Sequence, residues 1–261
     1  MTGIVPDGTL SAFLPRIVRK VWTREATSHI LRACKAHGVT ITHLANIASA
    51  LSAFDSHDSR VSANGNGDDS TVYFDFCQPI DLATKIREHS HGQASSEMEA
   101  AVRIGLYPIV LSIPRSAVAD AAQDPSTHIW SLARQFKKQN DAFVKSPHFW
   151  RFLEMYDAVF VEVYKAKLAG GPVLPFMSSL GDLKSLLPAQ YAFQGAEGAE
   201  IRITDMWVAG RLDTLALACH LFTFDGRLHL QLRYNANRTS PAMMEPWFDH
   251  VVDIVTHAAQ A

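Results

Sequence analysis

Two helical patterns follow a short opening stretch. Residues 1–20 contain two prolines and are interpreted as a lead-in segment. A helix is then expected from Thr23, whose side chain suits the N-cap, to Gly38, which suits the C-terminal stop. Thr40 precedes ITHLANIASALSAF, which is apolar on more than one face. The pattern therefore predicts one amphipathic helix and a second helix that lies centrally.

Polar loops and two strands are expected next. Residues 56–70 are polar and glycine-containing, and residues 85–98 are also polar, so both are predicted to be loops. STVYFDFCQPI (70–80) is rich in β-branched and aromatic residues and predicts a strand. AVRIGLYPIVLSI (101–113) predicts another, in which Pro108 indicates a bulge or an edge position.

Helical periodicity returns over two long segments. Residues 125–144 place apolar side chains on one face, and residues 148–168 carry a broad apolar stripe that Gly170–Gly171–Pro172 ends. Tyr156 and Tyr164 lie roughly on one face of the second helix, which core packing explains. Two consecutive helices are therefore predicted between the strands.

Strand signals dominate the last third. PVLPFMSSLG is one predicted strand, and ITDMWVAG, LDTLALACHLFTF and RLHLQLRYN form an expected meander, with Asp225–Gly226 as a hairpin turn. A final helix is predicted from Ser240–Pro241 to about His257. The order of elements, without an internal repeat or a dividing linker, indicates the α/β class: a mixed β-sheet packed with helices in one layered domain.

Composition and charge narrow the function classes. Apolar residues make up 48% and charged residues 19% of 261 residues, which is ordinary for a globular protein. A formal net charge of −2 with scattered basic residues offers no basis for binding nucleic acid or an anionic membrane. Three isolated cysteines, no long apolar run and no leader pattern predict a cytoplasmic protein.

Common catalytic motifs are missing from the sequence. It contains no P-loop, no GxSxG and no HExxH pattern. His89 and His91 form an HxH pair, but a solvated loop explains it better than a metal site, so no metal ligands are predicted. His148 begins a helix after Pro147, where a surface or capping role is the ordinary interpretation.

One segment, HLFTFDG (220–226), approaches the catalytic signature HHxxxDG. Four residues rather than three separate His220 from Asp225, and Cys219 stands where the signature has its first histidine. Asp225–Gly226 also lies between two apolar strands, where a hairpin turn calls for such a pair. The segment is interpreted as a strand and its turn, with a chemical role for His220 as the alternative.

Four segments, in order, carry a resemblance to a known family. HGVTITHLANIASALSAF resembles a helix of the form HGVT-x-x-x-L-x-x-A-x-x-x-A, and VYFDFCQPIDL resembles a strand ending in P-x-D-x-R, with Ala83 in place of the arginine. FMSSLGDL resembles an S-N-x-G strand, with Ser179 in place of asparagine, and FDGRLHLQLRYNANRTSPAMMEPWFDHVVDIV resembles a closing hairpin and helix. Residues 21–261 are therefore similar to the C-terminal lobe of the CoA-dependent acyltransferase superfamily, which includes chloramphenicol acetyltransferase, peptide-synthetase condensation domains and alcohol acyltransferases.

The resemblance implies where a small molecule would bind. Family enzymes bind donor thioester and acceptor in a tunnel between two lobes, and a histidine of the first lobe is the general base. The second lobe supplies tunnel walls, so the match to the S-N-x-G strand marks Ser178, Ser179 and Gly181 as substrate-binding candidates. Ser179 could donate a hydrogen bond to substrate, which makes it, with His220, a candidate catalytic residue.

Aromatic residues widen the candidate site, although core packing also explains them. Trp207, Phe222, Phe224 and Tyr234 could line an apolar pocket. Because the HHxxxDG motif is absent from this sequence, three hypotheses stand. The favoured one is an enzyme of secondary metabolism that acts on a small apolar metabolite and is repurposed for cyclisation, rearrangement or isomerisation without a cofactor. The others are half of a split CoA-dependent O-acyltransferase and a non-catalytic binding module.

The same resemblance predicts an association. A lobe that evolved against another lobe leaves a large apolar face, and soluble monomers seldom leave such faces bare. A homodimer or a separate partner lobe is therefore expected, with no nucleic-acid or membrane partner.

Overall fold

The computed structural model describes most of the chain. The described residues are 14–61, 71–89, 104–170, 176–192, 199–209, 217–237 and 239–260. Among them, the helices are α1 (Arg24–Ala36), α2 (Ile41–Val61), α3 (Leu82–His89), α4 (Arg115–Gln123), α5 (Pro125–Val144), α6 (Phe149–Gly170), the short 3-10 turn η1 (Leu183–Ser185) and α7 (Pro241–Ala258). The strands are β1 (Pro15–Val21), β2 (Thr71–Asp81), β3 (Ile104–Pro114), β4 (Phe176–Asp182), β5 (Gln190–Ala192), β6 (Glu200–Arg202), β7 (Ala218–Phe224) and β8 (Arg227–Asn235).

The first two helices begin and end largely as their capping residues predict. The Thr23 hydroxyl accepts the Ala26 N–H at 3.1 Å, and Gly38 takes φ +70° directly after α1. Helix α2 runs seven residues beyond the predicted end at residue 54 and takes in the start of the expected 56–70 loop. The polar residues 55–61 contain neither proline nor glycine, so nothing in them stops a helix.

A four-stranded sheet of order β1-β8-β7-β4 forms the body of the molecule. β7 and β8 are an antiparallel hairpin, and β4 joins β7 in parallel. The predicted hairpin turn is confirmed: Asp225 and Gly226 have φ +49° and +71°, as a type I′ turn requires at its two central positions. The sheet is mixed, and helices pack on it, which confirms the predicted fold class.

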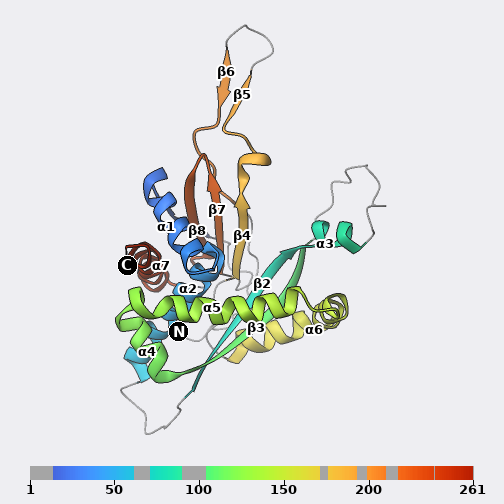
Figure 1. Cartoon of the computed structure of the whole chain (residues 1–261). Coiled ribbons are helices and arrows are strands. Elements are labelled where there is room, and N and C mark those ends of the chain that lie inside the picture. The colour runs from blue at the N-terminus through green and yellow to red at the C-terminus, as the bar shows by residue number, and fades with distance from the viewer. Residues whose placement is uncertain are drawn as a thin grey trace.

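Two expectations about strands need correction. The boundary predicted at residue 20 falls inside β1, which pairs with β8 in continuous register from Pro15 to Val21, so the end of the lead-in segment belongs to the sheet. Residues 203–209, expected as the first strand of a meander, have no regular secondary structure. The preceding residues instead form the small β5–β6 hairpin, which stands clear of the body in Figure 1.

A second group of elements packs around the two-stranded sheet of β2 and β3. The register between these strands is continuous through Pro108, so the proline marks an edge position and not a bulge. Helices α5 and α6 lie beside β3 (Figure 1). The ring of Phe136 on α5 contacts the ring of Phe76 on β2 edge-on, with ring centroids 5.0 Å apart. Helix α4 lies between β3 and α5, where the sequence interpretation marked no helix, and α3 takes up part of the predicted 85–98 loop.

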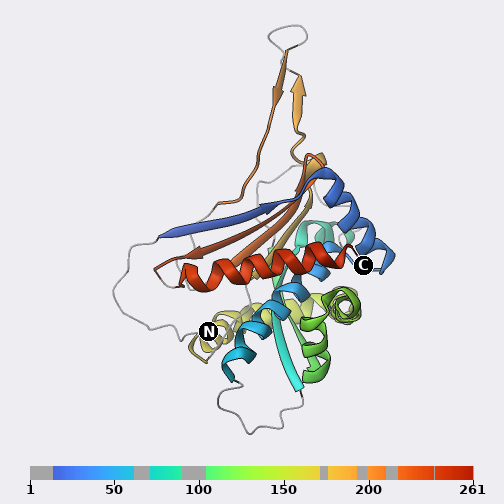
Figure 2. The same cartoon turned by 90° about the vertical axis from the view of Figure 1, so that its left-hand side faces the viewer.

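The main core lies between the helices and one face of the four-stranded sheet. Figure 2 shows α7 lying along that sheet, and α2 passes between α7 and α5 with close contacts to both. The central position predicted for α2 is confirmed, since Leu44, Ala45, Ala48 and Leu51 are completely buried. This helix-covered side is called the helix face below.

Candidate functional site

The other side of the sheet is chemically different. Strand side chains alternate between faces, so Cys219 and Leu221 of β7 enter the main core while His220 and Phe222 point to the opposite side. Phe222 and Phe224 form a small second cluster there with Leu183 of η1. We call this side the strap face; it carries Ala218, His220, Phe222, Phe224, Arg227, His229, Gln231 and Arg233.

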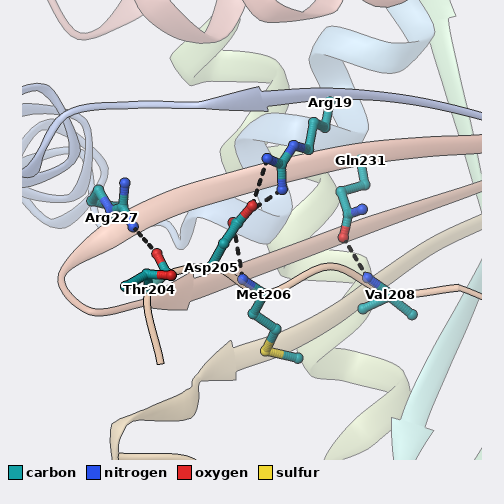
Figure 3. Close-up of polar contacts among 7 residues, drawn as sticks. All are labelled: Arg19, Thr204, Asp205, Met206, Val208, Arg227 and Gln231. Atoms are coloured by element: carbon teal, nitrogen blue, oxygen red, sulfur yellow. Dashed lines mark hydrogen bonds and ion pairs between the residues drawn. The ribbon is translucent and has the colours of Figure 1, made fainter. Parts of the chain in front are cut away.

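The extended segment 203–209, here called the strap, crosses this face (Figure 3). Arg19 of β1 donates two hydrogen bonds to the Asp205 carboxylate, at 3.0 and 2.7 Å. The Val208 N–H donates to Oε1 of Gln231 at 2.8 Å. Two sheet strands therefore hold the strap through side chains.

The strap is also fixed at its start and by apolar contacts. Arg227 donates to the Thr204 carbonyl at 3.1 Å, as Figure 3 shows. Ile203, Met206 and Val208 pack against the Phe222 cluster. Part of the strap face is thereby closed off from solvent by a segment that is not itself a strand or a helix.

A row of polar side chains runs across the strands at the level of His220. Ser178 of β4 lies opposite His220 of β7, and Gln231 of β8 lies opposite His220 on the other side. Residues opposite one another in an antiparallel pair have their Cβ atoms about 5 Å apart. Ser178, His220 and Gln231 are thus neighbours on one face.

Several buried polar atoms of the strap face have no hydrogen-bond partner among the described residues. They are both ring nitrogens of His220 and of His229, Nε2 of Gln231, and Nε and Nη1 of Arg233. His229 and Gln231 are fully buried, and His220 is 8% exposed. A buried polar group without a partner costs about 1–3 kcal/mol, more if charged. Unsatisfied polar groups are expected mainly at functional or strained positions of a fold.

Burial also sets the charge state of these groups. Desolvation, with Arg233 nearby, lowers the pKa of His220 to about 4, and desolvation, with Arg227 nearby, lowers that of His229 to about 4. Burial lowers the pKa of the Arg233 guanidinium as well. Both histidines are therefore neutral at pH 7. Neither has a hydrogen-bonded carboxylate among the described residues to orient it, as a histidine general base ordinarily has.

The three candidates from the S-N-x-G match are separated by the local structure of β4. Ser178 lies on the strap face beside His220, whereas Ser179 is turned to the helix side, where its Oγ accepts a hydrogen bond from the Thr42 hydroxyl of α2 at 2.9 Å. The register to β7 shifts between Ser179 and Gly181, and Gly181 has φ +72°. A glycine suits this position because of its backbone conformation.

The aromatic candidates are also distributed over different surroundings. Phe222 lies on the strap face and stacks on His229 with ring centroids 4.7 Å apart. Tyr234 belongs to the helix-face core, where its hydroxyl donates to the Glu245 carboxylate at 3.2 Å. Trp207 of the strap is 58% exposed. Of the residues proposed from the sequence, the structure brings together Ser178, His220 and Phe222.

Sequence reasoning overlooked the polar half of β8. RLHLQLRYN alternates polar residues with leucines, so His229, Gln231 and Arg233 share one face of the strand. The leucines between them are completely buried, which means that the polar residues stand on the second side of a covered sheet. That alternation was the available signal. The contact between Arg19 of β1 and Asp205 of the strap had no such signal, because the two residues are far apart in the sequence.

Comparison with solved structures identifies the fold. The chain superimposes on trichothecene 15-O-acetyltransferase from Fusarium sporotrichioides with a TM-score of 0.69 at 17% identity, covering 94% of this chain and 47% of that one. It matches the epimerization domain of tyrocidine synthetase B with a TM-score of 0.51 at 14% identity (94% and 48% covered). It matches the EpoB NRPS cyclization-docking bidomain from Sorangium cellulosum with a TM-score of 0.55 at 11% identity (99% and 44% covered).

The chain therefore has the fold of the CoA-dependent acyltransferase superfamily, as its sequence motifs predicted. It spans about half the length of each of these solved chains. No protein-family model and no curated protein sequence matches it. Its structural neighbours are acyltransferase and condensation-domain-like proteins of natural-product biosynthesis.

The described residues offer neither a membrane-spanning helix nor a metal cluster. None of their helices is long and apolar enough to cross a membrane. No group of three or more histidine, cysteine, aspartate or glutamate side chains among them is arranged to hold a metal ion. His89 ends α3, and His91 lies outside the described residues.

Proposed function

We propose that this chain is the substrate-binding lobe of an acyl-transferring enzyme of natural-product biosynthesis, whose histidine base is supplied by a second lobe. The observation that carries the proposal is the superposition of nearly the whole chain on about half of an O-acetyltransferase, at the highest TM-score of the three comparisons above. The small-molecule substrate binds over the strap face, and the thioester donor is the other substrate. Of the hypotheses from the sequence, the structure favours the split acyltransferase.

The chemistry of the strap face supports a binding role. Ser178, His220 and Gln231 lie in one row, and buried nitrogens of His220 and Gln231 are available for hydrogen bonds. Among the described residues, no carboxylate orients His220 or His229, and their pKa values of about 4 make both histidines poor bases at pH 7. The described residues of the strap face can bind and orient a substrate but include no oriented base. This is expected of a lobe whose active site is completed by a second lobe.

Exposed apolar side chains support the second lobe. Phe152, Met155 and Val159 lie along one side of α6 and are 49%, 59% and 48% exposed. Spacings of three and four residues place them on a single helix face. A contiguous apolar stripe of this kind is seldom left open to water. It provides a surface against which a partner could pack.

The proposal is tested by co-expressing this chain with a segment that carries the HHxxxDG motif and is encoded in the same gene or in a neighbouring one. We expect a one-to-one complex by light scattering, and acetyl-CoA binding by calorimetry to the complex but not to this chain alone. Met155→Asp should weaken the complex, while Glu154→Ala, an exposed change on the same helix, should not. Finding no such segment in the gene's surroundings, or no complex with it, contradicts the proposal.

Adjacent serines provide a matched test of where substrate binds. Ser178→Ala removes a hydroxyl from the strap face, and Ser179→Ala removes one from the opposite side. In the complex we expect Ser178→Ala to lower the rate of CoA release from acetyl-CoA and Ser179→Ala to leave it unchanged. The reverse result would move the binding site to the helix side of β4.

A stand-alone enzyme for cyclisation, rearrangement or isomerisation is the second candidate. Its supporting observation is the same set of unpartnered donors, because such reactions need mainly a shaped pocket and a few hydrogen bonds. Conversion of a polycyclic metabolite by this chain alone, with no thioester present, would select it over the lobe hypothesis. A pure binding module would show ligand binding in both tests and turnover in neither.

A further inference from the structure

Arg233 is an unusual residue for a sheet position on a covered face. It lies two residues beyond Gln231 on β8, opposite Ala218, and its Nε and Nη1 atoms are buried without an acceptor among the described residues. The other two arginines of this region are engaged: Arg19 binds the Asp205 carboxylate, and Arg227 binds the Thr204 carbonyl. Arg233 as a whole is half-buried, so its guanidinium is partly desolvated, and an acceptor that pairs with it would offset that cost.

The neighbours of Arg233 are donors as well. Nε2 of Gln231 is buried and free, while the acceptor oxygen of the same amide is taken by the Val208 N–H. His220, directly across from Gln231, has an unpartnered ring that can donate from either nitrogen, depending on its tautomer. Arg233 and His220 stand diagonally across the β7–β8 pair, a separation that a long side chain bridges.

These donors define what they can bind. With the amide oxygen occupied, the cluster of Arg233, Gln231 and His220 offers N–H groups to a ligand and calls for acceptors in return. It contains one positive charge and two neutral groups, so a single negative charge balances it, whereas a phosphate dianion would leave an excess. A carboxylate has the required charge and only acceptor atoms. Phe222, two residues from His220 on the same face, adds an apolar surface beside it.

We propose that Arg233, Gln231 and His220 form a carboxylate-binding subsite, so that the small molecule bound on the strap face is an organic acid. This inference rests on the proposed function for the location of the site and names the substrate class. Arg233 provides the charge, Gln231 and His220 add hydrogen bonds, and the strap, bound to Gln231 through Val208, holds the amide in the orientation that leaves Nε2 free.

Benzoate and benzamide, which share a ring and differ in charge, provide the probes. We expect benzoate to raise the midpoint of thermal unfolding of this chain, and we expect benzamide to leave it unchanged. The substitution Arg233→Met should weaken benzoate binding by at least about tenfold, which is the effect of losing a charge-assisted hydrogen bond. Arg32→Met is the matched control, because Arg32 is exposed on α1 and has no ion-pair partner among the described residues. Inorganic phosphate should stabilise the chain less than benzoate.

Three outcomes would overturn the inference. Equal stabilisation by benzamide would show that the ring and not the charge is recognised. Unchanged benzoate binding in Arg233→Met would place the acid elsewhere. A third outcome combines two results: the wild-type chain does not bind benzoate, and the Arg233→Met variant no longer assembles with the histidine-bearing segment. In that case the arginine pairs with a carboxylate of the partner lobe.

The test separates this inference from the proposed function. It uses the chain alone, so failure of the two-lobe complex to form leaves the benzoate result standing, and failure of benzoate to bind leaves the complex standing. An unliganded Arg233→Met chain should also be at least as heat-stable as the wild type, since a half-buried charge with no carboxylate partner among the described residues has been removed. A marked loss of stability would indicate a structural role for the arginine and count against the subsite.

Discussion

The two faces of the four-stranded sheet are made by the same strands and are organised in opposite ways. On the helix face, Leu228, Leu230 and Leu232 are completely buried against helices, and the Tyr234 hydroxyl has a hydrogen-bond partner in Glu245. On the strap face, the residues that alternate with those leucines and Tyr234 are His229, Gln231 and Arg233, and each has nitrogen atoms without a partner among the described residues. The helix face is built for stability, and the strap face retains groups that stability alone does not explain.

The largest expected difference between the faces appears on acidification. His220 and His229 have pKa values of about 4 in the folded chain against about 6.5 when unfolded, so the unfolded chain binds more protons between these values. Stability is therefore full above pH 6.5 and is lost as pH falls toward 4, by roughly 3 kcal/mol per histidine. Urea unfolding across this range measures the loss.

The double variant His220→Leu/His229→Leu should show a much shallower pH dependence. A remaining slope is expected from His43 of α2, whose pKa burial also lowers to about 4. An unchanged slope in the double variant would mean that the strap-face histidines do not titrate as their burial implies.

A paired substitution on β8 compares the faces directly. Leu230→Ala opens a cavity in the helix-face core and should cost about 3 kcal/mol of unfolding free energy. The neighbouring change His229→Leu removes two unpartnered buried nitrogens and should be nearly neutral or stabilising. Denaturant unfolding of both variants gives the comparison, and an equal loss in the two would remove the distinction between the faces.

The satisfied polar group of the helix face should have a smaller effect. Tyr234→Phe deletes the hydrogen bond to Glu245 and is expected to cost about 1 kcal/mol of unfolding free energy. Tyr73→Phe is the control, because Tyr73 is 69% exposed and should change the midpoint little. No difference between the two variants would indicate that water replaces Glu245 without cost.

The smallest global effect is expected at the strap. Asp205→Ala breaks a solvent-accessible ion pair with Arg19, which should cost less than about 1 kcal/mol of global stability. Hydrogen exchange at the Val208 amide should nevertheless accelerate, because the strap loses one of its attachments. Asp249→Ala, an exposed change on α7, is the control. Unaltered exchange would show that the apolar contacts of the strap suffice.

Much of the fold could be predicted because its signals are local. Thr23 and Gly38 bracket α1, and Asp225–Gly226 specifies a hairpin between two apolar strands, all through short-range chemistry. The same reasoning failed for β1, an edge strand whose charged residues conceal its pattern, and for the strap. Residues 203–209 have strand-like composition, yet after the backbone hydrogen bond from Ile203 to Ala189 it is side chains of β1 and β8 that hold them in place.

The candidate site was predictable only in part. The S-N-x-G resemblance led to Ser178, and the near-match to the catalytic signature drew attention to His220, which lies beside it. The same resemblance also marked Ser179, and the search for pocket aromatics marked Tyr234, but both side chains belong to the helix side of the sheet. A one-residue step along a strand reverses the face, and a motif match does not report which face is which.

The sequence by itself determined the class of fold, the β7–β8 turn and the alternation of leucines with polar residues in β8, because these depend on residues close together in the chain. Only the tertiary structure decided that His229, Gln231 and Arg233 of β8 keep buried nitrogen atoms without partners among the described residues. The contact between Arg19 and Asp205 joins residues 186 positions apart. Whether a buried polar atom is satisfied depends on such distant neighbours, and local sequence patterns carry no record of them.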